Sequence, residues 1–500
     1  MKNFLFYIDN WFFHFGIAKY MQEKTNNNLY AVIDTDEKSK SFYENQQLVN
    51  FKKKWFLSDP PFPINTKPNL SYLKKFEEKY KINLWKLAYS DRVFYQYNIH
   101  HKFSHNEILS LLEQKCRFYE DIFQEGMPDF FFSFLTVSYQ HVLLYEMCKA
   151  LGTKILMLQP IKFGNRMTIS SNSTSFDLIS NNNNPKLEIN SFEELRMYLK
   201  KFDTYDQTTV LMKESFESRT IDRYKSNFLF FIRFWDNDYQ KNYLNFNRTR
   251  RKIFLEKIFR SKQRKTRQLF LDKNCVKNLK LCKPYVYFPL HYEPERILLI
   301  DAPFYDDQLS IIKSIAKSLP INYTLCIKEH FMMKTLGWRD LTFYREITNL
   351  PNVKLLHPSL SPEEIIQESS LVITIAGTTG QEAAFYNKPS IVFIEQPYSV
   401  LSSVYTLKNI TELPEAIKSS LQLKVNLEEM IDYVNLVEKN SFEFYWRPIS
   451  NEFAFKFGFK GPVMTTELPH KKIEEFLNKY SSEFEILTNE HLKKLQSFYS

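Results

Sequence analysis

Short apolar runs alternate with amphipathic helical patterns over the first 160 residues, which is typical of an α/β sheet. The runs that we expect to form strands are Phe4–Ile8, Tyr30–Ile33, Phe130–Phe134 and Lys154–Leu158. A helix is predicted between the last two, from about Ser138 to Ala150, and Gly152 can end it in a left-handed conformation. A strand, a helix and a second strand in this order predict parallel neighbours.

The same alternation returns at Tyr285. Strands are predicted at Tyr285–Leu290, Tyr323–Ile327, Val353–Leu356, Leu371–Ile375 and Ile391–Ile394. Helices fit between them at about Tyr305–Ser318, Leu341–Asn349, Pro362–Ser369 and Gly380–Tyr386. This order of elements predicts a complete Rossmann-like domain.

The rest of the chain lacks strand alternation. A loop rich in Ser and Asn follows residue 170, and polar helical patterns continue through residues 190–270. The sequence therefore predicts the α/β class, with Rossmann-like domains at residues 1–170 and 284–430. A loop and helical basic bridge (171–283) joins them, and a helical tail (431–500) packs back on the body. Such an organisation indicates a two-domain protein with a cleft.

Composition narrows the class of protein. Only nine of 500 residues are glycine, which excludes collagen-like and Gly-rich architectures. Five cysteines without a CxxC pair make a disulfide framework or a zinc site unexpected. The N-terminal apolar run is stopped by Asp9, and no run approaches the ~18 apolar residues of a membrane span, so we expect a cytoplasmic protein.

Lys and Arg exceed Asp and Glu by 67 to 57, and residues 248–267 hold ten basic residues against one acid, Glu256. Ile253, Phe254, Ile258 and Phe259 recur among them at helical spacing. One interpretation is a solvated helix face. The other is a peripheral contact with anionic lipid, at the inner face of the plasma membrane. RNA binding is disfavoured, because no RNA-binding module accompanies the patch, and we expect no nucleic-acid partner.

The sharpest local motif lies where a buried strand runs into Gly377, Thr378, Thr379 and Gly380 and then into a helix. Glycines permit close approach of a ligand, and backbone N–H groups at a helix start attract anions. The motif predicts a phosphate site, whereas an ordinary capped turn is the alternative. Glu382 follows in the helix, where it can bind ribose or sugar hydroxyls or simply favour the helix start.

Two further segments place polar residues after predicted strands. Lys328 and His330 follow the strand that ends at Ile327, and a cation with an imidazole donor suits a phosphate leaving group. His291 and Glu295 lie on the loop after the first strand of the second domain. Surface or capping roles are the alternatives for each of them.

Together these segments resemble the capsule polysaccharide biosynthesis family, which includes Kdo transferases and sialyltransferase-like enzymes. The resemblance covers residues 284–400 and is based on the following motifs in order: Phe-Pro-Leu-His-Tyr-x-Pro-Glu, Asp307-Gln308, Lys-Glu-His, Arg339 to Tyr344, Leu-Pro-Asn-Val, Gly-Thr-x-Gly-x-Glu-Ala and Lys388-Pro389. Two departures are Phe331, where the family usually has proline, and Ile394-Glu395-Gln396-Pro397, where many members have glycine.

The resemblance implies a GT-B glycosyltransferase with two facing Rossmann-like domains. Lys328, His330 and the Gly377–Gly380 loop would contact the donor phosphate, and Glu382 would bind ribose or sugar. The donor would be a nucleotide sugar, for which a CMP-linked acidic sugar such as Kdo is one candidate. The acceptor would be a glycan or glycolipid precursor of a surface polysaccharide.

For the chemistry we expect neither a metal nor a separate cofactor, because no Asp-x-Asp motif ends a strand and cationic side chains can stabilise the leaving phosphate. His291 is a candidate catalytic residue, and Asp9, at the end of the first strand, is the candidate base. Asp34 and His141 have similar claims. Two other functions stay open, namely a non-catalytic assembly or export partner with a GT-B shell, and an NDP-sugar epimerase.

Overall fold

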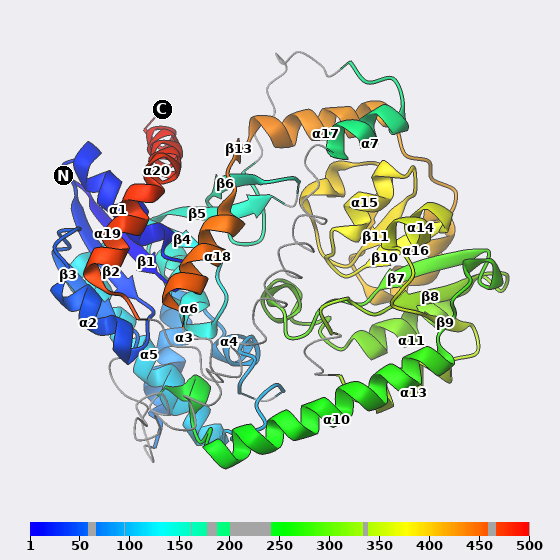
Figure 1. Ribbon diagram of the computed structural model, residues 1–500, viewed down its shortest axis with the longest axis horizontal. Coiled ribbons are helices and arrows are strands. Elements are labelled where there is room, and N and C mark those ends of the chain that lie inside the picture. The colour runs from blue at the N-terminus through cyan, green and yellow to red at the C-terminus, as the bar shows by residue number, and fades with distance from the viewer. Residues whose placement is uncertain are drawn as a thin grey trace. The chain divides into compact units, whose positions relative to one another are not determined.

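The computed structural model describes residues 1–499 except 59–66, 95, 162, 178–187, 201–241, 334–338 and 459–466. The chain divides into two units (Figure 1). The first unit contains the described residues of Met1–Asp177, Phe202–Ile253 and Asn440–Ser500. The second contains those of Leu178–Lys201 and Phe254–Lys439.

The first unit is built on a seven-stranded sheet in the order β13-β6-β5-β4-β1-β2-β3. Its strands are β1 (Asn3–Ile8), β2 (Asn28–Ile33), β3 (Lys53–Phe56), β4 (Phe130–Phe134), β5 (Lys154–Ile161), β6 (Arg166–Ser170) and β13 (Phe442–Glu443). The strands from β3 to β5 pair in parallel, whereas β6 and β13 each pair antiparallel to their neighbour. The sequence pattern predicted β1, β2, β4 and β5 and missed the three short outer strands.

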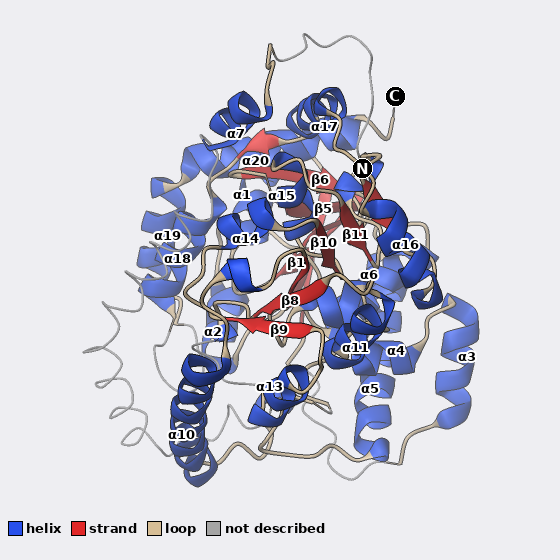
Figure 2. Cartoon of the chain, turned by 90° about the vertical axis from the view of Figure 1, so that its right-hand side faces the viewer, coloured by secondary structure: helices blue, strands red, loops and turns tan. Residues whose placement is uncertain are grey.

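Figure 2 colours the helices and strands of both units; in the first unit, helices pack on the sheet and on one another. They are α1 (Phe13–Lys24), α2 (Glu37–Asn45), α3 (Leu70–Tyr80), α4 (Leu84–Tyr89), α5 (His105–Gly126), α6 (Tyr139–Ala150), α18 (Trp446–Phe457), α19 (His470–Lys479) and α20 (Ser481–Gln496). The last three come from the C-terminal tail, and their apolar side chains share one core with β1 and α1. A Cβ atom on Gly16 of α1 would lie 2.2 Å from the ring of Phe484, so α20 packs where α1 has no side chain.

The second unit is built on a six-stranded parallel sheet in the order β12-β11-β10-β7-β8-β9. Its strands are β7 (Tyr285–Pro289), β8 (Thr324–Lys328), β9 (Val353–Leu356), β10 (Leu371–Thr374), β11 (Ser390–Val392) and β12 (Val404–Thr406). Numbered from β7, this order is 3-2-1-4-5-6 read from the other edge, the strand order of a Rossmann fold. The predicted Rossmann-like domain is confirmed.

Alternate residues of these strands face two cores. Val286, Phe288 and Ile327 pack with α11 (Gln308–Ser318), α13 (Leu341–Thr348) and α16 (Leu413–Ser420). Tyr285, Tyr287 and their neighbours pack on the other side with α14 (Pro362–Glu368) and α15 (Thr379–Phe385). The unit therefore has three layers, with the sheet in the middle.

The remaining described elements lie outside these layers. They are α7 (Phe192–Lys200), the long helix α10 (Arg250–Asn274), α17 (Leu427–Lys439), a π-helix at Ile297–Asp301, and single 3-10 turns at Tyr243–Asn245, Leu279–Leu281, Pro397–Val400 and Ile410–Glu412. The predicted helix at Tyr305 starts later, at Gln308, because the Asp307 carboxylate accepts hydrogen bonds from the N–H groups of Leu309 and Ser310.

The predicted α/β class with two parallel-sheet domains is thus confirmed. Polar helices were predicted through residues 190–270, and the part at residues 201–241 lies outside the described residues. The facing arrangement of the two domains stays a prediction.

Candidate functional site

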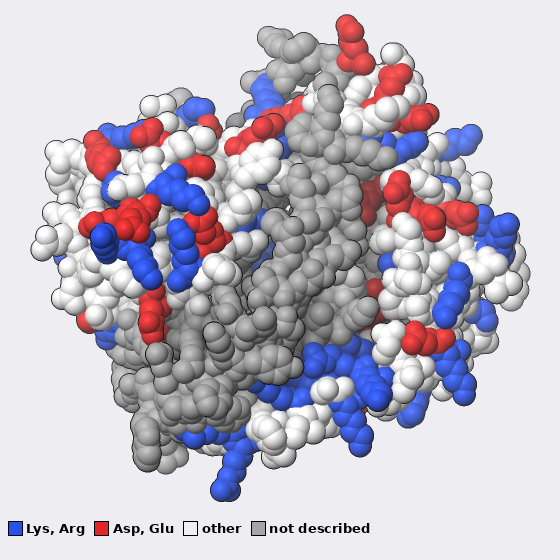
Figure 3. Space-filling model, in the orientation of Figure 1, with Lys and Arg blue, Asp and Glu red and all other residues white. Residues whose placement is uncertain are grey.

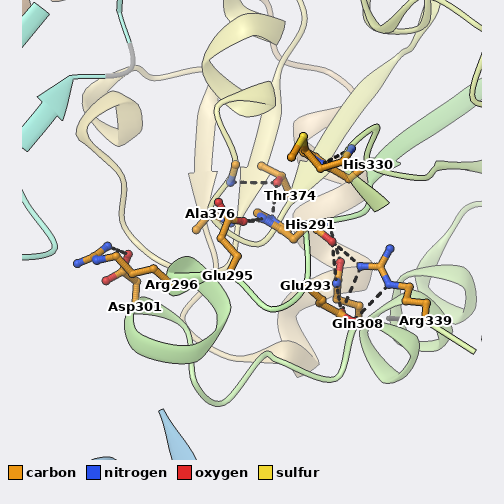
Figure 4. Close-up of polar contacts among 12 residues, drawn as sticks. His291, Glu293, Glu295, Arg296, Asp301, Gln308, His330, Arg339, Thr374 and Ala376 are labelled. Atoms are coloured by element: carbon orange, nitrogen blue, oxygen red, sulfur yellow. Dashed lines mark hydrogen bonds and ion pairs between the residues drawn. The ribbon is translucent and has the colours of Figure 1, made fainter. Parts of the chain in front are cut away.

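Three of the predicted functional segments follow three adjacent strands of the second unit. Strand β7 pairs with β8 on one side and with β10 on the other. In an open parallel sheet, the loops after neighbouring strands diverge at the point where the strand order reverses, and ligands bind in the crevice there. This switch point lies between β7 and β10, and Figure 4 shows the residues around it.

His291, on the loop after β7, lies at this switch point and contacts residues at the end of β10. Its Nε2 atom lies 3.2 Å from Oγ1 of Thr374, at the end of β10, and accepts a hydrogen bond from the N–H of Ala376 at 3.4 Å (Figure 4). Because Nε2 accepts from this N–H, it carries no proton, so the Thr374 hydroxyl donates to Nε2 while its oxygen accepts from the N–H of Gly377. The ring proton is therefore assigned to Nδ1, which faces Oε2 of Glu295 at 4.0 Å.

The loop Gly377–Gly380 is packed closely against two side chains. A Cβ atom on Gly377 would lie 2.6 Å from Thr374 Oγ1, and one on Gly380 would lie 2.7 Å from the Tyr398 hydroxyl. That hydroxyl also donates a 2.5 Å hydrogen bond to the carbonyl of Gly377. Both glycines are thus required by close approach, and Thr378, at the start of α15, makes no side-chain capping bond.

A buried ionic network fixes the loops after β7 and β8. Arg339 contacts the carboxylates of Glu329 and Glu293 and donates to the carbonyl of His291 (Figure 4). Burial alone would lower the pKa of Arg339, but the two carboxylates raise it above its ordinary value. Gln308 accepts from the N–H of His291 at 2.8 Å and donates to Glu293. The main chain on either side of His291 is held by these contacts.

Glu329 therefore faces the interior, while Lys328 and His330 flank it. Lys328 is 8% exposed, and burial lowers its pKa to about 8. Within the described part of the chain, its amine forms no hydrogen bond or ion pair. Burial lowers the pKa of His330 to about 4, and its Nδ1 accepts from the N–H of Met332, so the ring is neutral at pH 7 with its proton on Nε2.

The other predicted site residues are Glu295, Glu382 and Asp9. Glu295 is one-third exposed beside His291, and Glu382 lies in the first turn of α15, one turn from Thr378. Asp9 belongs to the first unit, where it follows β1 and accepts from the N–H of Trp11 at 3.0 Å. Burial raises its pKa to about 7.

The two alternatives to Asp9 are held by core contacts. Asp34 accepts a 2.8 Å hydrogen bond from the Tyr7 hydroxyl, and burial raises its pKa. His141 bonds to Ser133 at 2.5 Å and stacks on the Tyr7 ring at a centroid distance of 3.7 Å. Both side chains are therefore engaged in structural contacts within the first unit.

Sequence reasoning gave no role to Thr374, Gln308, Arg339 and Tyr398. Gln308 and Arg339 stand within the family pattern, and Thr374 is a polar residue at the end of a buried strand, which is a usable signal. Tyr398 has no sequence signal, because it reaches Gly377 from 21 residues away.

Neither metal-like clusters nor membrane spans occur in the described ranges. No three His, Cys, Asp or Glu side chains there are grouped so that they could hold a metal ion. No described helix is long and apolar enough to cross a membrane. A cavity of about 330 Å³ lies elsewhere in the second unit, lined by Phe304, Asp307, Lys408 and neighbours, and includes none of the predicted site residues.

A known family matches the part of the chain that contains most of this site. Residues 191–402 match the family described as capsule polysaccharide biosynthesis protein. The resemblance inferred from the sequence motifs is confirmed. All of the site residues in the second unit fall within the match to the capsule polysaccharide biosynthesis family, whereas Asp9 lies outside it.

Several solved structures are similar to the chain at low identity and low TM-score, and no curated protein matches the chain. The β-Kdo 2,4 transferase KpsC of Thermosulfurimonas dismutans is 10% identical, with a TM-score of 0.31, over 67% of this chain and 93% of that one. Its β-Kdo 2,7 transferase counterpart is 12% identical, with a TM-score of 0.27, over 72% and 98%. The UDP-GlcNAc 2-epimerase of Methanocaldococcus jannaschii, in complex with UDP-GlcNAc and UDP, is 13% identical, with a TM-score of 0.27, over 87% and 98%.

Proposed function

We propose that the protein is a glycosyltransferase that moves a sugar from a nucleotide donor to a surface or capsular polysaccharide precursor. The main support is Lys328, a nearly buried amine without a partner in the described structure, at the end of a strand next to the switch point. A buried cation is costly unless an anion compensates it, and the diphosphate or monophosphate of a nucleotide sugar supplies that anion. The match to the capsule polysaccharide biosynthesis family supports the choice of substrate class.

In this proposal the leaving phosphate is bound by Lys328, by the neutral Nε2–H of His330 and by the Gly377–Gly380 loop with the hydroxyls of Thr378 and Thr379. These donors are fixed before the reaction, so they stabilise the charge that develops as the glycosidic bond to the phosphate breaks. Glu295 and Glu382 accept hydrogen bonds from sugar or ribose hydroxyls.

His291 and Asp9 are the proposed catalytic residues. The Nδ1–H of His291 faces Glu295, and this pair orients the donor sugar at the switch point. Asp9 accepts the proton of the acceptor hydroxyl as that oxygen attacks the anomeric carbon. A pKa near 7 suits this role, because the carboxylate is ionised at working pH and still basic enough to accept a proton.

The proposal extends to the substrates and the place of reaction. An acidic sugar such as Kdo, linked to CMP, suits a cationic donor site, and the acceptor is a glycan or glycolipid precursor in the cytoplasm. The proposed site needs no metal or separate cofactor, because Lys328 supplies the positive charge.

The test combines binding with product analysis. CMP, UDP and GDP are titrated into the full chain and into Lys328→Met, and binding is followed by calorimetry. Lys354→Met is the matched control, because Lys354 is an exposed lysine on the neighbouring strand β9. We expect one nucleotide to bind the wild type and Lys354→Met alike, and to bind Lys328→Met at least about tenfold more weakly.

The corresponding nucleotide sugar is then incubated with the protein and a glycan acceptor, and the products are separated by mass and by NMR. Sugar transfer supports the proposal. Inversion of a ring carbon in the free nucleotide sugar would identify an epimerase instead. Failure of all three nucleotides to bind would leave the non-catalytic assembly partner as the better interpretation.

A further inference from the structure

One face of helix α10 exposes large apolar and basic side chains together. Phe254, Leu255, Ile258, Phe259 and Leu269 are 53–63% exposed, and Lys262 and Lys265 are exposed between them. With 3.6 residues per turn, the positions 255, 258, 262, 265 and 269 form one straight stripe along the helix, flanked by 254 and 259. These seven residues are called the α10 patch.

The opposite face of the helix is fixed to the protein. Leu271 belongs to the core of the second unit, and Arg267 is 4% exposed. At the C-terminal end, on the same side as the patch, Asp272 bonds to His357, just after β9, at 3.0 Å. These contacts fix the orientation of the helix, and the side chains of the α10 patch are therefore exposed to solvent.

The seven patch residues include no carboxylate, and the half-exposed Asp272, which continues the stripe beyond Leu269, is paired with His357. From Arg251 to Leu271 the helix has one acidic residue, Glu256, whose side chain is 11% exposed and is paired with Arg260 at 2.5 Å. Figure 3 shows Lys and Arg gathered over α10 at the lower edge of that view, with uncharged side chains between them. The surface therefore offers positive charge and apolar area at the same place.

We propose that the α10 patch lies on the surface of an anionic lipid bilayer. Water disfavours a row of exposed Phe, Leu and Ile side chains, whereas the interfacial region of a membrane accepts them and the lysines bind lipid phosphates. RNA would pair with the lysines but would leave Leu255, Ile258 and Leu269 in water. The proposal does not depend on the nucleotide site. Of the two interpretations of the basic stretch, the exposed apolar stripe favours contact with a membrane over a solvated helix face.

The experiment is flotation of the full chain with vesicles of phosphatidylcholine, alone or mixed with phosphatidylglycerol. We expect binding only to the mixed vesicles, and loss of that binding at high salt. Lys262→Glu with Lys265→Glu is expected to weaken it at least about tenfold. The matched control is Lys418→Glu with Lys424→Glu, the same charge change at exposed positions elsewhere in the second unit.

A second pair of variants tests the apolar part. Ile258→Ser with Phe259→Ser is expected to weaken flotation at least about tenfold, whereas the exposed Ile321→Ser is expected to leave it unchanged. Circular dichroism and the cooperativity of urea unfolding show whether each variant is folded. If the serine pair does not fold, the lysine pair still decides.

Equal flotation with neutral and anionic vesicles, or unchanged flotation of the lysine variants, would overturn the proposal. So would single-stranded RNA binding that the patch variants abolish while vesicle binding persists. If the wild-type protein floats with anionic vesicles but binds none of the nucleotides, the proposed function is contradicted and the membrane proposal is still supported.

Discussion

Arg339 and Glu329 form an ion pair inside the second unit, where their side chains are only 2% and 5% exposed. Glu329 stands between Lys328 and His330, so the pair fixes the segment that presents both. Arg339 also bonds to the carbonyl of His291, which ties the loop after β7 to the loop after β8. One buried guanidinium thus positions the predicted residues of two strands.

Removal of this guanidinium should destabilise the protein strongly. Arg339→Met leaves the buried Glu329 and the partly buried Glu293 without their cation, and we expect a loss of about 3–5 kcal/mol in the free energy of unfolding, measured with urea. Lys313→Met, which breaks the exposed pair with Glu346, should cost at most about 1 kcal/mol. Adding Glu329→Gln to Arg339→Met should restore part of the loss. Equal effects of the two single variants would contradict the role of the buried network.

The affinity for the nucleotide should fall as pH rises above about 8. Burial lowers the pKa of Lys328 to that value, so the free protein loses its positive charge there, and each further pH unit weakens binding by up to about tenfold. Calorimetry between pH 6.5 and 9.5, a range that spans the lowered pKa, measures this effect. Lys328→Met should bind weakly at all these pH values, and Lys354→Met should follow the wild type. A flat wild-type profile would exclude Lys328 as the phosphate cation.

The sequence predicted most of the second unit because its strands are short, mostly apolar and separated by amphipathic helices. Val353–Leu356 was predicted with the exact bounds of β9. Strand β3 was missed because it begins with two lysines and shows no apolar run, and β13 depends on pairing with β6, more than 270 residues earlier. That partnership is a tertiary effect that no local pattern contains.

The candidate site was predictable in its strand ends but not in its internal partners. Lys328, His330, His291 and the glycine loop were found because polar residues after buried strands are conspicuous. The role of Glu329 depends on Arg339, ten residues away across segments that the chain folds together, and the closeness of Gly380 to Tyr398 depends on packing. Such contacts arise from tertiary packing, and no spacing of residues along the sequence predicts them.

Gly380→Ala should destabilise the protein, and the cause can be tested directly. The new Cβ would lie 2.7 Å from the Tyr398 hydroxyl, so the tyrosine must move, at a cost of about 1–3 kcal/mol. Tyr398→Phe removes the nearest atom, although it also removes the hydrogen bond to Gly377. We therefore expect the double variant to lose less stability than the sum of the single variants, as measured by urea unfolding. Strictly additive losses would show that the contact with Tyr398 is not the cause.

The first unit should lose stability in mild acid through two buried histidines. His14 and His491 lie with ring centroids 6.2 Å apart between α1 and α20, and burial lowers the pKa of both, to about 4 for His491. The unfolded chain binds protons on them below about pH 6.5, so the native state loses stability as pH falls from there towards 4, by about 2 kcal/mol at pH 5 for His491. His14→Phe should flatten the dependence of Tm on pH in this window. An unchanged slope in His14→Phe would rule out this histidine as a cause.

If Asp9 accepts the acceptor proton, its pKa should appear in the rate of sugar transfer. Burial raises this pKa to about 7, so kcat/KM should rise with pH and level off above about 7, as the carboxylate becomes ionised. Asp9→Asn removes the base and should lower kcat by about 10²–10⁴-fold with little change in the KM of the donor. Asp34→Asn is the matched control, because Asp34 is a buried carboxylate of the same unit that already accepts from Tyr7. Retention of activity and pH profile in Asp9→Asn, together with a large loss in Asp34→Asn, would transfer the role of base to Asp34.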